Sequence, residues 1–395
     1  MLDFNKLMQQ IDQVGQESLS ENFDEHETVL NAHEAYDAAR ENESLSDRLK
    51  ENQASVMWPV AIPLERFGNV YKVEPRRDPV TVIGIDGSQI MPSHHEVHAC
   101  YLLNIGVAMI TYGQKHPPIL ESVPRLYHRP EDLYPLVDRR RFHIDELFIS
   151  LERTLLEMQV LLQRSLEAQG RGVPVVALFD GSLISWSVEK LPESHQISYN
   201  ERLMKTLGAF RTERIPIIGY LSHSRSSDIV NVLRVAICPY EKSRCREYCG
   251  HLNEEDFPCS RVWPISDRQV LHGKLEHGHR SAAFISNSSA TKTLPPAHKI
   301  CFAYLNTGYE IARLEFPQWL FAEGELLKLA FSVAMAQSQK GMGYPICLSE
   351  AHHLAVVRGK DREQFFNLMT EHLVGMGVRR VRVSPKESKK RSGFV

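Results

Sequence analysis

The chain has 395 residues, a formal net charge of −3, and a composition that is 43% hydrophobic and 24% charged. This is typical of a soluble globular protein, and it excludes one that coats nucleic acid through overall basicity, although a local basic groove would still serve DNA binding. No apolar run approaches the length of a membrane span, and residues 1–6 lack the start of a signal peptide, so we expect a cytoplasmic protein with no membrane partner.

The first half of the chain alternates predicted helices and strands. Apolar residues at loosely helical spacing predict helices over residues 1 to about 55. Two apolar stretches, 81–85 and 98–110, lie on either side of a short turn and predict a strand hairpin. Residues 145–169 carry a regular helical stripe of apolar residues, and a strand follows from Pro174. The next predicted elements are a helix at 199–210, a strand at 216–221 and a helix at 228–236.

An irregular insertion that contains cysteines, at about 238–262, interrupts this alternation. The elements predicted beyond it are strands at 303–305 and 311–316, a helix at 323–339, a strand at 354–358, a helix at 361–374 and a strand at 379–383. Mixed helices and strands indicate an α/β (or α+β) fold with one central sheet flanked by helices. We divide the chain into an N-terminal helical region (1–75), a sheet-containing domain (76–384) and a basic, disordered tail (385–395).

The tripeptide Asp-Gly-Ser occurs twice, each time at the end of a strongly apolar stretch, and places Asp86 and Asp180 there. Asp-Gly is a common turn pair, so one copy would indicate little. Two such carboxylates on adjacent buried strands would converge on one point, and the glycine after each would let a bulky anionic substrate approach. Carboxylate oxygens suit Mg²⁺ or Mn²⁺, and the chemistry that such a site favours is metal-assisted phosphodiester hydrolysis.

Residues elsewhere in the chain could complete this site. The helix predicted before the second Asp-Gly-Ser carries Glu157 and Glu152, and spacing does not choose between them; a helical Glu more often lies on a solvated face. Tyr344 precedes His352 by eight residues. Tyr can position a water or a phosphate, and His can complete a carboxylate-rich metal site. The neighbouring His353 leaves the choice of histidine open, and a packed or surface histidine is the commoner outcome.

The insertion contains Cys238, Cys245, Cys249 and Cys259, spaced C-x6-C-x3-C-x9-C. This spacing is not the paired C-x2-C pattern of strong zinc sites. Two interpretations therefore stay open: a structural Zn²⁺ site, or a set of reduced thiols in a surface insertion.

Motifs in a fixed order between residues 81 and about 358 connect the chain to a known family. They are Ile85-Asp86-Gly87-Ser88, Leu178-Phe179-Asp180-Gly181-Ser182, Ile311-Ala312-Arg313-Leu314-Glu315-Phe316-Pro317, and Tyr344-Pro345 followed by Ala351-His352. On this ordered set the chain resembles the NurA family of DNA-repair nucleases. The resemblance implies an RNase H-like nuclease domain in residues 76–384 that assembles as a ring-like homodimer. It further implies Mn²⁺-dependent (or Mg²⁺-dependent) 5′-to-3′ exonuclease activity, with single-strand endonuclease activity.

The resemblance also implies a partner and roles for residues. The chain has no P-loop of its own, and the family acts on single- and double-stranded DNA with a HerA-like hexameric ATPase in double-strand break resection. Carried over by motif, Asp86, Asp180 and His352 are metal ligands, Tyr344 is the active-site tyrosine, and Glu157 matches the family's helical glutamate. Two alternatives stay open: a catalytically degenerate DNA-binding adaptor on a nuclease-like fold, and a metal-dependent phosphoesterase acting on nucleotides.

Overall fold

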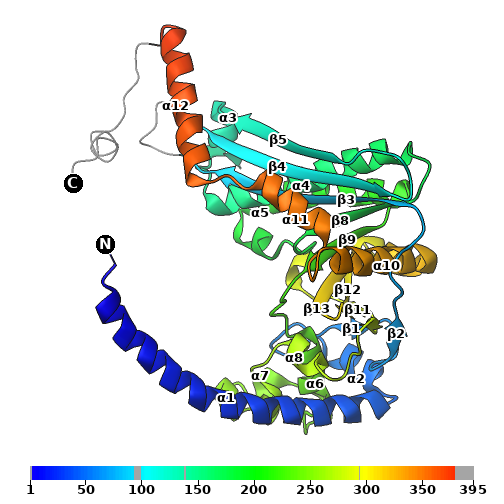
Figure 1. Ribbon diagram of the computed structural model, residues 1–395. Coiled ribbons are helices and arrows are strands. Elements are labelled where there is room, and N and C mark those ends of the chain that lie inside the picture. The colour runs from blue at the N-terminus through cyan, green and yellow to red at the C-terminus, as the bar shows by residue number, and fades with distance from the viewer. Residues whose placement is uncertain (1, 93–98, 138, 293, 379–395) are drawn as a thin grey trace. The chain divides into compact units, whose positions relative to one another are not determined.

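The computed structural model describes residues 2–92, 99–137, 139–292 and 294–378. The chain folds into two compact units (Figure 1). Unit 1 comprises Met1–Glu74, Leu221–Thr293 and Lys299–Gln318, and unit 2 comprises Pro75–Tyr220, Leu294–His298 and Trp319–Val395. The strand predicted at 379–383 and the disordered tail predicted at 385–395 lie outside the described residues.

A mixed sheet forms the centre of unit 2, in the order β9-β8-β3-β4-β5. Its strands are β3 (Val80–Ile90), β4 (Tyr101–Tyr112), β5 (Ile119–Tyr127), β8 (Val175–Asp180) and β9 (Ile217–Leu221). β3, β4 and β5 are antiparallel neighbours, whereas β8 is parallel to both β3 and β9. The apolar runs of β3 and β8 are buried because both faces of the sheet are covered. The predicted α/β class, with a central mixed sheet flanked by helices, is confirmed.

Helices α4 (Glu146–Gln169) and α11 (Ile346–Ala355) cover opposite faces of this sheet (Figure 1). Successive residues of β3 point to opposite faces of the sheet, so Gly84 and Gly87, three positions apart, lie on different faces. A Cβ at Gly84 would meet the backbone of Cys347 in α11, whereas one at Gly87 would meet Glu157 in α4. The remaining elements of this part are α3 (Pro130–Leu133), β6 (Leu136–Val137), β7 (Arg140–Arg141), α5 (Glu193–Thr212), α9 (Gln318–Ala322), α10 (Gly324–Lys340) and α12 (Gly359–Gly375).

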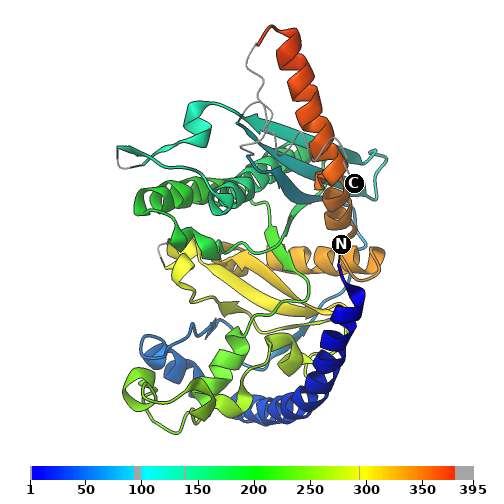
Figure 2. The same ribbon diagram turned by 90° about the vertical axis from the view of Figure 1, so that its left-hand side faces the viewer.

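Unit 1 combines the N-terminal helices with a smaller sheet. Its helices are α1 (Phe4–Glu41), α2 (Leu45–Asn52), α6 (Asp228–Ala236), α7 (Cys245–Tyr248) and α8 (Asp267–Leu271). Its strands are β1 (Ile62–Pro63), β2 (Val70–Lys72), β10 (His279–Ser281), β11 (Phe284–Ile285), β12 (Ile300–Asn306) and β13 (Ile311–Pro317). β12 and β13 lie antiparallel, side by side (Figure 2).

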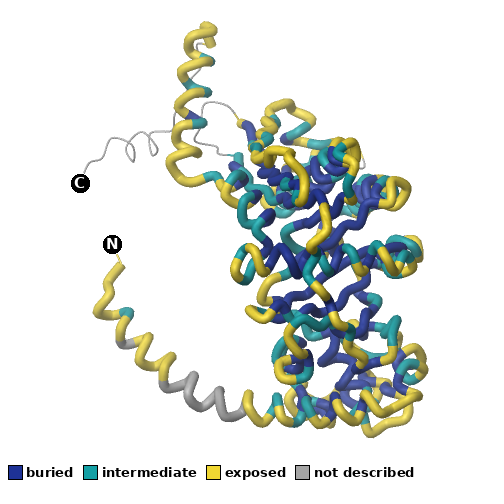
Figure 3. The backbone as a smooth tube through the Cα atoms, turned by 45° about the vertical axis from the view of Figure 1, so that its right-hand side comes forward, coloured by how far each residue is buried: buried dark blue, intermediate teal, exposed yellow. Residues whose placement is uncertain are grey.

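Helix α1 changes character along its length (Figure 3). Leu2, Phe4 and Ile11 near its start are exposed, whereas Ala32 and Tyr36 are buried in a core shared with α2, α6, α8 and β12. The N-terminal helices thus pack against segments more than 180 residues later in the chain. The boundaries at residues 75 and 384 stay a prediction. Among the described residues, no helix has both the length and the apolar character needed to cross a membrane.

Most predicted elements are present, including the hairpin β3–β4, the strand pair β12–β13, and α6 with the predicted bounds. The strand predicted at 354–358 is wrong, because α11 extends through Ala355 and is followed by non-helical backbone. The apolar run at its end resembles a strand, but Cys347, Leu348, Ala351 and Ala355 are all buried, and their spacing is that of one helix face. This correction matters for the site, because α11 carries His352.

Candidate active site

The two Asp-Gly-Ser motifs lie on neighbouring parallel strands of unit 2. Asp180 ends β8, as predicted, whereas Asp86 lies within β3, which continues to Ile90, directly after the last residue that pairs with β8. Ile85 of β3 lies opposite Phe179 of β8, so the register places Asp86 beside Asp180 at the carboxyl edge of the sheet. Both carboxylates are half-buried. The backbone N–H of Gly87 donates to Asp86 Oδ1 at 2.7 Å, which fixes that carboxylate. Convergence of the two acids, which the sequence predicted from strand ends alone, is present.

His352 joins the two aspartates. Its Nδ1 lies 2.7 Å from Oδ2 of Asp86, which accepts. One ligand atom from each of Asp86, Asp180 and His352 lies within 4.8 Å of the other two, and no other such group of His, Cys, Asp or Glu occurs in the described part of the chain. The exposed His353 is not part of it. The structure therefore separates the two adjacent histidines that the sequence could not.

Two glycines of the sheet allow α11 to approach closely, and this approach brings His352 next to Asp86. A Cβ at Gly84 of β3 would overlap the carbonyl of Cys347, and one at Gly106 of β4, which pairs with Asp86, would overlap the carbonyl of Ala351. Without side chains at these positions, the backbone of α11 packs directly on the sheet. This close approach places the start of the last helical turn over Asp86.

Side chains of the sheet then fix the end of α11. Ser88 Oγ donates to the carbonyl of Ala355 at 2.5 Å, and Asn104 Nδ2 donates to the carbonyls of Leu354 at 3.1 Å and Ala355 at 2.9 Å. Ser122 Oγ in turn donates to Asn104 Oδ1 at 2.6 Å. These donors satisfy carbonyls that a helix end otherwise leaves unpaired. The sequence analysis did not identify these donors, because their only signal in the sequence is a polar Asn inside an apolar strand.

Tyr344 lies on the other side of the site, beside Asp180. Its hydroxyl donates to Asp180 Oδ1 at 2.5 Å. The preceding turn has Met342 at φ 54° and Gly343 at φ 127°, and it directs Tyr344 toward the strand end. Burial raises the pKa of Asp180, and the hydrogen bond from Tyr344 opposes that shift. Burial and the nearby Asp180 raise the pKa of Tyr344 far above its ordinary value, so its hydroxyl stays a donor at neutral pH.

Glu157 approaches from α4, on the opposite face of the sheet. It is 4% exposed and lies where a Cβ at Gly87 would otherwise be. Burial raises its pKa from 4.5 to about 8; Arg153, whose Nε is 3.1 Å from Oε1, opposes the shift, and Asp86 and Asp180 add to it. Glu157 is not one of the three residues whose ligand atoms lie within 4.8 Å of one another, but both aspartates raise its pKa.

Glu152 has a different environment. Arg202 binds it with two hydrogen bonds, of 2.6 Å and 2.9 Å, so its charge is already matched. The two glutamates, which spacing did not distinguish, thus have different surroundings: Glu157 lies against Gly87, next to Asp86, and Glu152 is held by a salt bridge.

These side chains form a site with an excess of negative charge. Three acidic groups, Asp86, Asp180 and Glu157, approach one another with Arg153 as the nearby cation. Burial and the neighbouring acids disfavour the charged forms of Glu157 and Asp180. A divalent cation with a preference for oxygen and imidazole ligands, such as Mg²⁺ or Mn²⁺, would remove that repulsion, so the donor set fits the ion that the sequence predicted. The predicted cysteine set lies elsewhere, in unit 1.

A family model and several solved structures match this chain. A family model described as "NurA domain" matches residues 80–357, which is more than half of the chain. The chain is similar to the NurA nuclease from Sulfolobus solfataricus, with 14% identity over 78% of this chain and 87% of that one and a TM-score of 0.47. It is also similar to the catalytic domain of human Endonuclease V, with 12% identity over 76% and 92% and a TM-score of 0.31. A comparison with curated protein sequences gives no match.

Proposed function

The chain belongs to the NurA family, and from that premise and the acidic site of unit 2 we propose that it is a metal-dependent deoxyribonuclease. The observation that carries the proposal is the convergence of Asp86, Asp180 and His352, whose ligand atoms lie within 4.8 Å of one another. A site that only binds DNA has no use for converging carboxylates, because they repel phosphate. This argues against a DNA-binding adaptor without activity.

We assign the residues of the site the following roles. Asp86, Asp180, Glu157 and His352 would hold one or two Mn²⁺ or Mg²⁺ ions. When bound, such ions lower the pKa of a coordinated water and stabilise charge on the leaving oxygen. Tyr344, a hydrogen-bond donor at neutral pH, would orient the scissile phosphate. Arg153 opposes the effect of burial on the pKa of Glu157, but that pKa still lies at about 8, so this carboxyl would be ionised at neutral pH only with a metal ion bound.

Digestion of end-labelled DNA tests the proposal. We expect cleavage of single- and double-stranded DNA with Mn²⁺ or Mg²⁺, and none with EDTA or with Ca²⁺, which prefers a larger and looser coordination shell and is a poorer Lewis acid. Labels at the 5′ and 3′ ends separate 5′-to-3′ digestion from the reverse, and circular single strands report endonuclease activity. Cleavage in excess EDTA, or full activity of Asp86→Ala, would reject the metal assignment.

A substrate-length series separates the nuclease from the alternative phosphoesterase. A nuclease should act faster on long strands than on dinucleotides, because phosphates beyond the cleaved bond add binding free energy through backbone contacts that read no sequence. Equal rates on a mononucleotide ester and a long strand would favour the phosphoesterase.

The proposed biological setting is double-strand break resection with a HerA-like hexameric ATPase. The chain has no P-loop, so translocation along duplex DNA needs a separate motor. We propose a cytoplasmic homodimer that receives DNA from that motor. Co-purification and a gel-based resection assay test this: we expect strong stimulation with ATP and none with a non-hydrolysable analogue. Full-rate digestion of long duplex by the nuclease alone, with no complex, would show a self-sufficient enzyme.

A further inference from the structure

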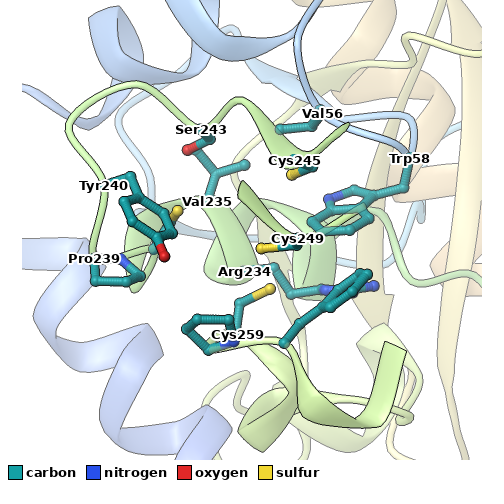
Figure 4. Close-up of a pocket in the computed structure, with 13 residues that line it drawn as sticks. Val56, Trp58, Arg234, Val235, Pro239, Tyr240, Ser243, Cys245, Cys249 and Cys259 are labelled. Carbon is teal, nitrogen blue, oxygen red and sulfur yellow. The ribbon is translucent and has the colours of Figure 1, made fainter. Parts of the chain in front are cut away.

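Four cysteines of unit 1 come together around one pocket. Cys238, Cys245, Cys249 and Cys259 all line it. Figure 4 shows the side chains of Cys245, Cys249 and Cys259 around the same space. All four are free thiols. Burial raises the pKa of Cys245 and of Cys249, and the other sulfurs nearby raise it further. Residues 238 to 259 are therefore folded so that their only cysteines gather at one place.

The segment that carries them has little regular structure and only a small apolar core of its own. Its regular structure consists of α7, which has four residues, and a 3₁₀ helix at Glu254–Asp256. Its own core has three buried residues, Cys249, Phe257 and Cys259, and two of these are the thiols themselves. So small an apolar core supplies little stability, and small substructures of this kind commonly depend on a bound metal or on disulfides.

Arg234 of α6 lies against the same pocket with part of its hydrogen-bonding capacity unused. It is 1% exposed, and its guanidinium carbon lies 3.5 Å from the centre of the Trp58 ring (Figure 4). Nη1 pairs with Glu254 Oε1 at 3.0 Å, but Nε and Nη2 are buried without a hydrogen-bond partner in the described structure. Buried donors of a charged group are costly to leave unpaired. Their presence beside four sulfurs points to an anionic group in the pocket.

We propose that Cys238, Cys245, Cys249 and Cys259 bind one structural zinc ion as thiolates, with Arg234 as the neighbouring cation. Each thiol gives its proton to solvent when it binds, and four thiolates around Zn²⁺ form a complex of charge −2. A positive guanidinium with free N–H donors lowers the free energy of burying that charge, as second-shell donors do in metal sites. Four soft sulfur ligands favour Zn²⁺, in contrast to the oxygen-rich site of unit 2.

Binding would draw the sulfurs closer together. No three of them lie within 4.8 Å of one another, whereas thiolates around one zinc, at about 2.3 Å from it, are closer than that. Rotation about χ1 moves a thiol sulfur without moving the backbone, and the irregular segment allows small further shifts. We therefore expect the zinc to order this segment as it binds.

Metal analysis of the full-length protein, purified in chelator-free buffers, tests the proposal. We expect about one zinc per chain, and the same content in Asp86→Ala, because the proposed site is independent of the acidic one. The double variant Cys245→Ser/Cys249→Ser should lose the zinc, whereas Cys100→Ser, a buried cysteine of unit 2, should keep it. An absence of zinc, a loss of zinc in the control variants, or iron with acid-labile sulfide would overturn the assignment.

Cobalt binding provides a test that does not depend on a folded variant. After removal of zinc, titration of the wild-type chain with Co²⁺ should give the absorption bands of a tetrahedral cobalt thiolate, and added Zn²⁺ should remove them. Arg234→Ala should lower the zinc affinity about 10- to 100-fold in competition with a chromogenic chelator. Octahedral cobalt spectra in the wild-type protein, or unchanged zinc affinity in Arg234→Ala, would contradict the proposed ligands or the role of the arginine.

Discussion

Two clusters of buried charge, one in each unit, differ in how their charges are balanced. In unit 1, Arg313 is fully buried and pairs with Asp228 at 2.7 Å and Glu315 at 2.9 Å, and its guanidinium lies 3.7 Å from the centre of the Phe302 ring. In unit 2, Asp86, Asp180 and Glu157 approach one another with Arg153 as their nearby cation.

The carboxylates of the Arg313 cluster have partners within the protein. The same holds for the adjacent Asp267, which accepts the backbone N–H groups of Ile229 and Val230 at 2.9 Å each and the hydroxyl of Tyr304 at 2.6 Å. A cluster in which partners are supplied by the fold acts on stability. In unit 2, by contrast, ligand atoms of Asp86, Asp180 and His352 lie close enough together to share one metal ion. Arg313 and the two aspartates all lie in the motifs on which the sequence resembles the NurA family, so membership of such a motif does not by itself distinguish these two roles.

The largest expected effect is the loss of nuclease activity in Asp86→Ala and in Asp180→Ala. Removal of one ligand from a multi-carboxylate metal site should slow cleavage by about 1,000-fold or more, or roughly 4 kcal/mol. Without metal, the melting temperature should be unchanged or higher, because like-charge repulsion is relieved. Assays on end-labelled DNA measure the cleavage rate, and thermal unfolding measures the melting temperature. A variant that is stably folded and cleaves DNA at the wild-type rate would show that the acidic cluster of unit 2 is not a catalytic metal site.

Arg313→Met should lower the stability of the protein, in contrast to the aspartate variants, which should lose activity and keep their stability. It leaves Asp228 and Glu315 buried without their cation, so we expect a loss of about 3–5 kcal/mol in the free energy of unfolding, measured with urea. The matched control is Arg214→Met, which removes an exposed pair with Glu323 and should change stability by less than about 1 kcal/mol. Similar small losses in both variants would show that the buried network does not stabilise unit 1.

The two glutamates of α4 provide a finer comparison. Glu157→Gln should lower the cleavage rate by about 100-fold, because it removes a carboxylate that faces the strand ends. Glu152→Gln should retain the rate within a few-fold, since that side chain is bound to Arg202. Equal, near-normal rates in single-turnover assays would mean that neither glutamate acts in the reaction.

The smallest effect concerns pH. The pKa of Glu157 is raised from 4.5 to about 8, so the folded state binds more protons than the unfolded state between these values. Its contribution to stability therefore falls as pH rises through this window. In EDTA, the difference in melting temperature between Glu157→Gln and wild type should grow in favour of the variant from pH 5.5 to pH 8.5. Parallel curves would show that this carboxyl is not perturbed.

Much of the fold and the site could be predicted from sequence, for local reasons. The apolar runs before Asp86 and Asp180 predict strands, and the helical stripe before Pro174 connects them, so the parallel pair β3–β8 follows from short-range patterns.

The rest depends on contacts between distant residues. Glu152 and Glu157 look alike along α4, and only Arg202, 50 residues later, distinguishes them. The strand predicted at 354–358 failed for a related reason, because Gly84 and Gly106 on two strands of the sheet create the surface on which α11 packs. The sequence likewise does not indicate that Arg234 lies beside the cysteines, because the ring against which its guanidinium packs belongs to Trp58, 176 positions away in the chain.

The hydrogen bonds that fix the end of α11 also couple the movement of His352 to that of Asp86. Ser88 is two residues from Asp86 on one strand, and its acceptor, Ala355, is three residues from His352 on one helix. The aspartate and the histidine are thus anchored to the same small block, and a displacement of β3 carries both with it. Asp180 and Tyr344 form a second such pair through their own hydrogen bond. A fluctuation of the site therefore changes the distance between the Asp86–His352 pair and the Asp180–Tyr344 pair, while the geometry within each pair is retained.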